Sequence, residues 1–257
     1  FLSLIARFVG VALNFAVILI ITNQLSKTAA GDLMLLMTFI TGVALISRLG
    51  VDQLLMKEVA SSHYDNVSFK SAFLSMSYKV VFALSLIFIA VWLFATPFLQ
   101  DSFFRNGSIT TVTKTELIVA SLGILFYNLV ILNSTYLKAI KKTVLGVLGQ
   151  NALTAITFLF LIAVFWAYFS NNEYTIYLFT ASLIMAGLLA AVFTYGFTTK
   201  QNRFVSNDSK TFTEVAPNFK QVLSKSIPLA PISIISYLMI FTDTIMVGWF
   251  LTNDHVA

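Results

Sequence analysis

The sequence predicts an all-α integral membrane protein, a polytopic bundle with seven transmembrane helices. Of its 257 residues, 58% are hydrophobic and only 11% are charged, whereas soluble domains average about 25% charged residues. The apolar residues lie in blocks of about 20 or more, long enough for a helix to cross a hydrocarbon core of about 30 Å. The chain contains no cysteine, which excludes disulfides, thiolate metal sites and cysteine nucleophiles.

Seven apolar blocks are expected to span the membrane: Phe1–Leu25, Leu33–Leu55, Ser71–Phe98, Leu117–Leu137, Thr143–Phe169, Tyr174–Thr198 and Ile227–Leu251. The first block has no small-residue cleavage site, so we interpret it as a span and not as a signal peptide. Because the chain begins with Phe and not Met, we expect a trimmed N-terminus. The loop Pro97–Glu116 carries a turn signal at Asn106–Gly107.

The spacing of the blocks predicts three parts: a six-helix bundle over residues 1–198, a polar cytoplasmic linker over 199–226, and the first helix of a second bundle over 227–257. Pro228 and Pro231 lie in the first turns of the last helix, where proline is tolerated or kinks the helix. The chain ends six residues after this block. We therefore expect most of the second bundle to lie beyond this sequence.

The basic residues predict the orientation. If the first span starts in the cytoplasm, 13 of the 16 Lys and Arg residues fall at inner ends and loops, and only Lys27, Arg105 and Lys114 fall outside. This is a strong positive-inside signal, and it accounts for most loop lysines without a functional role.

Charged residues inside the spans have two possible roles each. Arg7 shares a helix face with Gly10 and Asn14, and its guanidinium either snorkels to the interface or lines a cavity and binds phosphate. Arg48 and Asp52 lie four residues apart, so they either pair with each other or contact a ligand.

Asp243 lies in the outer half of the seventh span, where a carboxylate is costly unless it faces protein or water. Ser233 and Ser236 share its polar stripe. We leave open whether Asp243 and Asp52 couple ion movement to transport or pair helices.

Uncharged polar residues mark the fourth and fifth spans. Asn128 and Asn133 lie in the fourth span, and Lys138 lies at its end. In the fifth span, Gly146 and Gly149 would allow close helix approach, with Gln150 bonding across the contact. Glu116 is expected as a first-turn carboxylate beside a helix N-terminus.

No catalytic arrangement is recognisable in the sequence. His63 and His255, the two histidines, lie in expected loops, and we find no nucleophile–base set, phosphate-binding Gly-rich loop or metal-ligand spacing. The basic residues follow topology, so nucleic-acid binding is not expected. We predict that the protein is not an enzyme and needs no cofactor or metal.

Three stretches carry a family resemblance. These are the opening span with Arg7, Gly10 and Asn14, the segment Ser47–Gln53 with the following Lys57–Ala60, and Phe241–Phe250 (FTDTIMVGWF). The chain resembles the first half of a polysaccharide flippase of the O-antigen type, from the superfamily that also includes multidrug-toxin extruders. In that family two six-helix bundles enclose a central cavity.

The resemblance implies that the protein moves an undecaprenyl-pyrophosphate-linked oligosaccharide across the bacterial inner membrane for O-antigen, capsule or exopolysaccharide biosynthesis. Membrane lipids, a polysaccharide polymerase and chain-length proteins are the further partners that it implies. We expect the substrate to meet these cationic and amide side chains: Arg7, Asn14, Arg48, Asn128, Asn133, Lys138 and Gln150.

Two alternatives remain. One is a cation-coupled drug extruder of the same fold. Such a protein needs an acid in the first bundle, but here the first span has none and Asp52 lies at a span end beside Arg48. The other is a membrane polymerase or ligase of glycan assembly. Such enzymes generally use a large outer loop with Arg or His residues, and the longest outer loop here is Pro97–Glu116.

Overall fold

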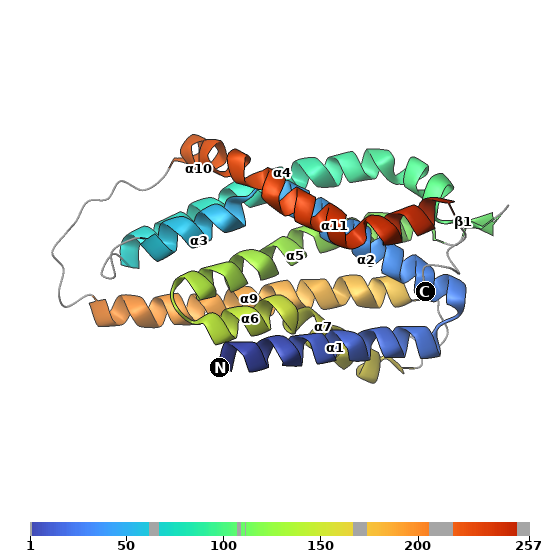
Figure 1. Ribbon diagram of the computed structural model, residues 1–257, viewed down its shortest axis with the longest axis horizontal. Helices are drawn as coiled ribbons and strands as arrows, with labels where there is room; N and C mark the ends of the chain where they lie inside the picture. The colour runs from blue at the N-terminus through green and yellow to red at the C-terminus, as the bar shows by residue number, and fades with distance from the viewer. Residues whose placement is uncertain are drawn as a thin grey trace.

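The computed structural model describes residues 2–61, 67–106, 109–110, 112–166, 174–205 and 218–250. Almost all of them are helical, and the long helices run side by side along the long axis of the molecule (Figure 1). The helices are α1 (Leu2–Gln24), α2 (Lys27–Arg48), α3 (Val51–Ser61), α4 (Val67–Phe103), α5 (Lys114–Ala139), α6 (Thr143–Asn151), α7 (Leu153–Val164), α9 (Thr175–Val205), α10 (Phe219–Ser226) and α11 (Ala230–Phe250), with the 3₁₀ turn η1 (Ile227–Leu229).

The predicted fold class is confirmed. In the described residues, six helices are long and apolar enough to cross a membrane, or seven if the bent pair α6–α7 counts as one span. The strands β1 (Arg105–Asn106) and β2 (Ile109–Thr110) form a short antiparallel hairpin between α4 and α5. This hairpin agrees with the turn expected at Asn106–Gly107, although residues 107–108 lie outside the described part.

The prediction that the second span is one continuous helix is wrong. Leu33–Leu55 was expected as one helix, but α2 ends at Arg48, and α3 begins at Val51. Leu49 and Gly50 separate them, with φ angles of 45° and 75° in the left-handed region. Such angles end a helix, and glycine adopts them most readily.

Gly50 also permits a close backbone approach. A Cβ atom there would lie 2.8 Å from the Ser226 carbonyl oxygen and 2.9 Å from the Ala230 nitrogen. The break between α2 and α3 therefore contacts the irregular turn η1 that leads into α11. This turn contains Pro228, which agrees with the expected kink at the start of the seventh span.

The fifth span is bent by 48° between α6 and α7, at Ala152. The third and sixth helices extend beyond their expected bounds, because α4 continues through Pro97 to Phe103 and α9 continues to Val205. The predicted linker is partly helical, since it includes the end of α9 and all of α10. Residues 206–217 of the linker are outside the described part.

Central helix α5 organises the bundle. It packs along α9 and also contacts α2, α3, α4 and α6, and its buried residues belong to both large apolar clusters of the core. Its start is fixed by Thr113 and Glu116, which form a reciprocal capping box. The expected first-turn role of Glu116 is therefore confirmed.

Helix α11 lies across α2 (Figure 1). The Tyr237 ring packs on Gly42, where any Cβ would collide with it. Its hydroxyl donates to the Thr38 carbonyl oxygen at 2.6 Å. Gln53 Nε2 donates to Ser233 Oγ at 2.7 Å. The helix predicted to open a second bundle thus contacts the first bundle through side chains on α2 and α3.

Candidate functional site

The candidate site residues fall into two groups at different helix contacts of α5. The first group, here the buried network, joins α2, α3, α4 and α5. It consists of Ser47, Arg48, Asp52, Ser85 and Asn128. The second group, here the basic cluster, joins α1, α5 and α6. It consists of Arg7, Asn14, Lys138 and Gln150.

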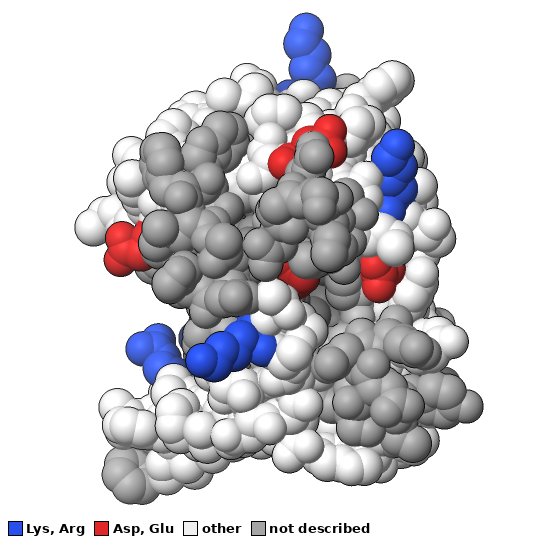
Figure 2. Space-filling view, turned by 90° about the vertical axis from the view of Figure 1, so that its right-hand side faces the viewer, with Lys and Arg blue, Asp and Glu red and all other residues white. Residues whose placement is uncertain are grey.

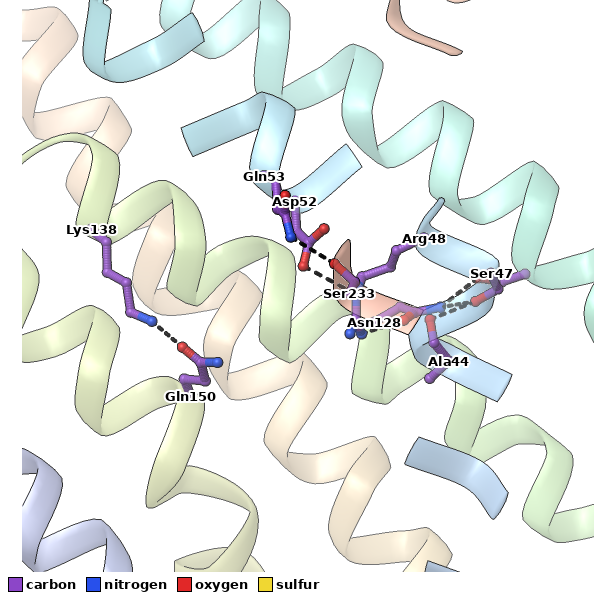
Figure 3. Close-up of polar contacts among 10 residues, drawn as sticks. Ala44, Ser47, Arg48, Asp52, Gln53, Asn128, Lys138, Gln150 and Ser233 are labelled. Carbon is purple, nitrogen blue, oxygen red and sulfur yellow. Dashed lines mark hydrogen bonds and ion pairs between the residues drawn. The ribbon is translucent and has the colours of Figure 1, made fainter. Parts of the chain in front are cut away.

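In the buried network, the Asn128 amide is the hub (Figure 3). Its oxygen accepts from Arg48 Nη1 at 2.8 Å, and its Nδ2 donates to Ser47 Oγ at 2.7 Å and to Ser85 Oγ at 2.8 Å. Both amide hydrogens are therefore used within the protein. Asn128 is 1% exposed, so its amide serves helix packing in this conformation and not an open surface.

Arg48 is buried as well, with 4% of its surface exposed. Its Nε lies 3.6 Å from Asp52 Oδ2, which confirms the local pairing that the sequence suggested. The Arg48 Cζ atom also lies 6.0 Å from the centre of the Tyr127 ring, within range of a cation–π attraction.

The Arg48–Asp52 pair bridges the helix break. Arg48 is in the last turn of α2 and Asp52 in the first turn of α3. A cation at a helix C-terminus and an anion at a helix N-terminus are both favoured by the helix dipoles. Ser85 is the middle residue of α4, and Asn128, which accepts from Arg48, is near the middle of α5. The pair therefore lies near the centres of these two spans, whereas we expected Arg48 at the inner end of a span.

Asn133 belongs to a neighbouring contact between α4 and α5. Its Oδ1 accepts a hydrogen bond from the Tyr78 hydroxyl, and its Nδ2 donates to the Leu129 carbonyl oxygen at 2.7 Å. Asn133 is fully buried. Its polar atoms, like those of Asn128, are bonded inside the bundle.

The basic cluster forms where α1 packs on α6. Gly10 allows this contact, because a Cβ there would lie 2.6 Å from the Asn151 Cβ. Asn14 Nδ2 donates to the Asn151 carbonyl oxygen at 2.7 Å and to the Gly10 carbonyl oxygen at 2.8 Å. Gly10 and Asn14, two residues of the predicted common face, therefore contact α6.

Lys138, in the last turn of α5, also contacts α6. Its Nζ donates to Gln150 Oε1 (Figure 3), and the predicted bond by Gln150 across a helix contact is confirmed. Gly146 and Gly149 make room for it, since Cβ atoms there would lie 2.6 Å from the Ser134 carbonyl oxygen and 2.7 Å from Ser134 Oγ.

The electrostatics of the basic cluster differ from those of the buried network. Lys138 experiences repulsion from Arg7 and a weaker attraction from Asp52. No described carboxylate lies within ion-pair distance of Arg7 or Lys138. Arg7 is exposed, and Lys138 is partly buried. Lys138 is therefore within electrostatic range of the Arg7 cation and of the Asp52 carboxylate, and neither cation has a described carboxylate at ion-pair distance.

Asp243 is exposed on α11, with no described basic side chain at ion-pair distance. The polar stripe expected for this helix is only partly visible, because Ser233 contacts Gln53 and the side chain of Ser236 is outside the description.

Some participants carried no sequence signal that singled them out. Ser85 lies in the most apolar part of α4, and Tyr78 is one of many aromatic residues. Only the fold brings them to Asn128 and Asn133. In the described residues, no group of three or more His, Cys, Asp or Glu side chains could hold a metal.

The whole chain, residues 1–257, matches the model of a family described as polysaccharide biosynthesis protein. The chain belongs to this family. Neither the comparison with curated proteins nor that with solved structures found a match. Family membership, together with the apolar helices, identifies a membrane protein with a role in polysaccharide synthesis or export.

Proposed function

We propose that the protein is a flippase for undecaprenyl-pyrophosphate-linked oligosaccharide, moving it from the inner to the outer leaflet of the bacterial inner membrane. The supporting observation is that Arg7 on α1 and Lys138 on α5, which both helices present at α6, lie within electrostatic range of each other, and neither has a described carboxylate at ion-pair distance. Placing like charges together costs free energy, and an anionic ligand removes that cost. A pyrophosphate supplies two adjacent anionic groups.

The two cations would divide the work by their chemistry. The planar Arg7 guanidinium suits two phosphate oxygens at once, whereas the Lys138 ammonium acts as a point charge. Gln150 accepts from Lys138 and keeps its Nε2 as a donor for a sugar hydroxyl. A cationic drug would be repelled by both charges, which disfavours the drug-extruder alternative.

In this proposal the protein is a transporter and not an enzyme, and it acts by alternating access between two bundles. Its product would pass to a polysaccharide polymerase and chain-length proteins that build O-antigen, capsule or exopolysaccharide. Asp52 and Asp243 are the acids that could couple transport to ion movement. Asp243 is the better placed of the two, because Asp52 already pairs with Arg48.

Orientation is part of the proposal. Figure 1 places α3, α10, the start of α1 and the end of α9 toward one end of the bundle, and most Lys and Arg residues belong to these and neighbouring segments. At the opposite end, Figure 2 shows basic and acidic side chains scattered among uncharged ones. An excess of basic residues marks the cytoplasmic side, so the N-terminus would be cytoplasmic. Alkaline phosphatase fused at Asn207 should be inactive, and activity there would contradict this orientation.

The functional test uses cells that lack the protein. They should accumulate the lipid-linked repeat unit in the inner leaflet and lose surface polysaccharide, and the native gene should restore both. A strain that assembles normal surface polysaccharide without the protein would contradict the proposal. Accumulation of the repeat unit in the outer leaflet would instead indicate a polymerase or ligase.

A further inference from the structure

A pocket of about 240 Å³ lies between helices α4 and α5, and no residue of the basic cluster lines it. Its lining includes Tyr78, Lys79 and Phe82 from α4 and Leu125, Asn128 and Leu129 from α5. Phe82 and Lys79 are exposed, and Leu125 and Leu129 are partly exposed. The pocket therefore opens on the outer surface of the bundle.

The pocket is apolar although two polar residues line it. The Tyr78 hydroxyl donates to Asn133, and the Asn128 amide is bonded to Arg48, Ser47 and Ser85. Their polar groups therefore face into the bundle, and the pocket is left with ring and aliphatic carbon. A sugar would find no hydrogen-bonding partner on this wall, whereas a hydrocarbon chain would give up no hydrogen bonds by entering the pocket.

The one charged residue of the lining is Lys79, which contributes its carbon chain to the wall and is exposed. Lys79 lies six residues before Ser85, the middle of α4, which places it about 9 Å toward the basic end of the bundle at the helical rise. A lysine at this depth extends its ammonium group to the headgroup region. No described carboxylate lies within ion-pair distance of Lys79.

We propose that this pocket is a binding site for one anionic phospholipid, with an acyl chain between α4 and α5 and the headgroup phosphate on Lys79. The combination of an apolar slot and a cation at headgroup height matches a lipid of this class. The site is separate from the basic cluster, so the inference does not depend on the proposed transport function. Bound lipid would stabilise the contact between α4 and α5, two of the four helices that form the buried network.

The experiment is native mass spectrometry of the purified native protein, titrated with phosphatidylglycerol and, in parallel, with phosphatidylethanolamine. The wild type should bind phosphatidylglycerol more tightly. Lys79→Gln should weaken that binding about fivefold, the effect of one lysine at an anionic surface. It should weaken phosphatidylethanolamine binding much less, because the ammonium group of that lipid neutralises its phosphate. Leu129→Trp fills the slot and should weaken binding of both lipids.

Two controls separate the site from general surface charge and from misfolding. Lys57 is an exposed cation on α3 outside the pocket, and Lys57→Gln should bind like the wild type. Lys79→Gln changes an exposed side chain, so its fold, checked by gel filtration and circular dichroism, should be intact.

Equal affinity for the two lipids, or unchanged binding by Lys79→Gln, would overturn the proposal. Displacement of phosphatidylglycerol by an equal concentration of undecaprenyl phosphate would also overturn it, because the pocket would then belong to the carrier lipid.

Discussion

The buried network and the basic cluster each contain an arginine from the first two helices, but their surroundings are opposite. Arg48 is 4% exposed and has Asp52, Asn128 and the Tyr127 ring around it. Arg7 is exposed, and the Lys138 cation lies within its electrostatic range. A buried charge must be compensated by the protein itself, whereas an exposed pair of like charges is compensated by solvent or by a ligand.

This difference teaches how to separate structural from functional charges in a membrane bundle. Removing Arg48 should damage the fold, because Asp52 and the Asn128 oxygen would lose their partner. Removing Arg7 should leave the fold intact, because no described residue depends on it for an ion pair. The predictions below run from the largest to the smallest expected effect on stability.

Arg48→Met should destabilise the protein most. Breaking a buried ion pair by removing one partner costs about 3–5 kcal/mol, and Asp52 is only 19% exposed in its side chain. We expect a strong loss of folded protein in the membrane, measured by immunoblot and by thermal unfolding of purified protein. The double variant Arg48→Met with Asp52→Leu removes both charges and should recover part of the stability. If the single variant has wild-type abundance and stability, the proposed difference between the buried network and the basic cluster is wrong.

Asn128→Ala should have the next largest effect. It leaves Arg48 Nη1 without its acceptor and removes both donors to Ser47 and Ser85, so we expect a loss of about 1–3 kcal/mol. The matched control is Asn14→Ala. Asn14 is exposed and bonds only to backbone carbonyls, so its loss should cost less than that of Asn128. Thermal unfolding of both variants in the same detergent makes the comparison, and equal losses would contradict it.

Arg7→Ala should have the smallest effect on stability and a large effect on export. Exposed substitutions away from special features change stability by within about 0.5 kcal/mol. Surface polysaccharide, normalised to the amount of protein in the membrane, should nevertheless be lost. Arg7→Lys keeps the charge without the planar fork and should be partly active. Lys142 lies exposed in the turn between α5 and α6, and Lys142→Ala should export normally. Normal export by Arg7→Ala would mean that Arg7 only snorkels to the interface.

The sequence predicted the fold class because a long apolar block leaves few alternatives to a membrane helix. It predicted the Arg48–Asp52 pair, the Glu116 cap and the close contacts at Gly146 and Gly149, because these depend on residues near each other in the chain or on small side chains. It missed the break at Leu49–Gly50, since one glycine within an apolar block is also compatible with a continuous helix.

The division of the candidate residues into two regions could not be predicted. Asn128 and Lys138 lie on one helix, and only the packing of α4 and α6 on that helix decides what each contacts. The role of Ser85 could not be predicted either. Its Oγ accepts a hydrogen bond from the Asn128 amide, and nothing in the sequence of an apolar span indicates that contact. Spacing along a helix predicts the face on which a side chain lies but not the residue that it contacts.

The most direct test of the central claim, that the basic cluster binds the pyrophosphate of a lipid-linked oligosaccharide during transport, uses the purified native protein in liposomes. Lipid-linked oligosaccharide is confined to the inner leaflet, and its arrival outside is measured by a lectin added to the external solution. The account predicts rapid lectin labelling with the wild type and with Lys142→Ala, and labelling at the protein-free rate with the double variant Arg7→Ala and Lys138→Ala. Wild-type labelling by the double variant, at equal protein incorporation, would contradict it.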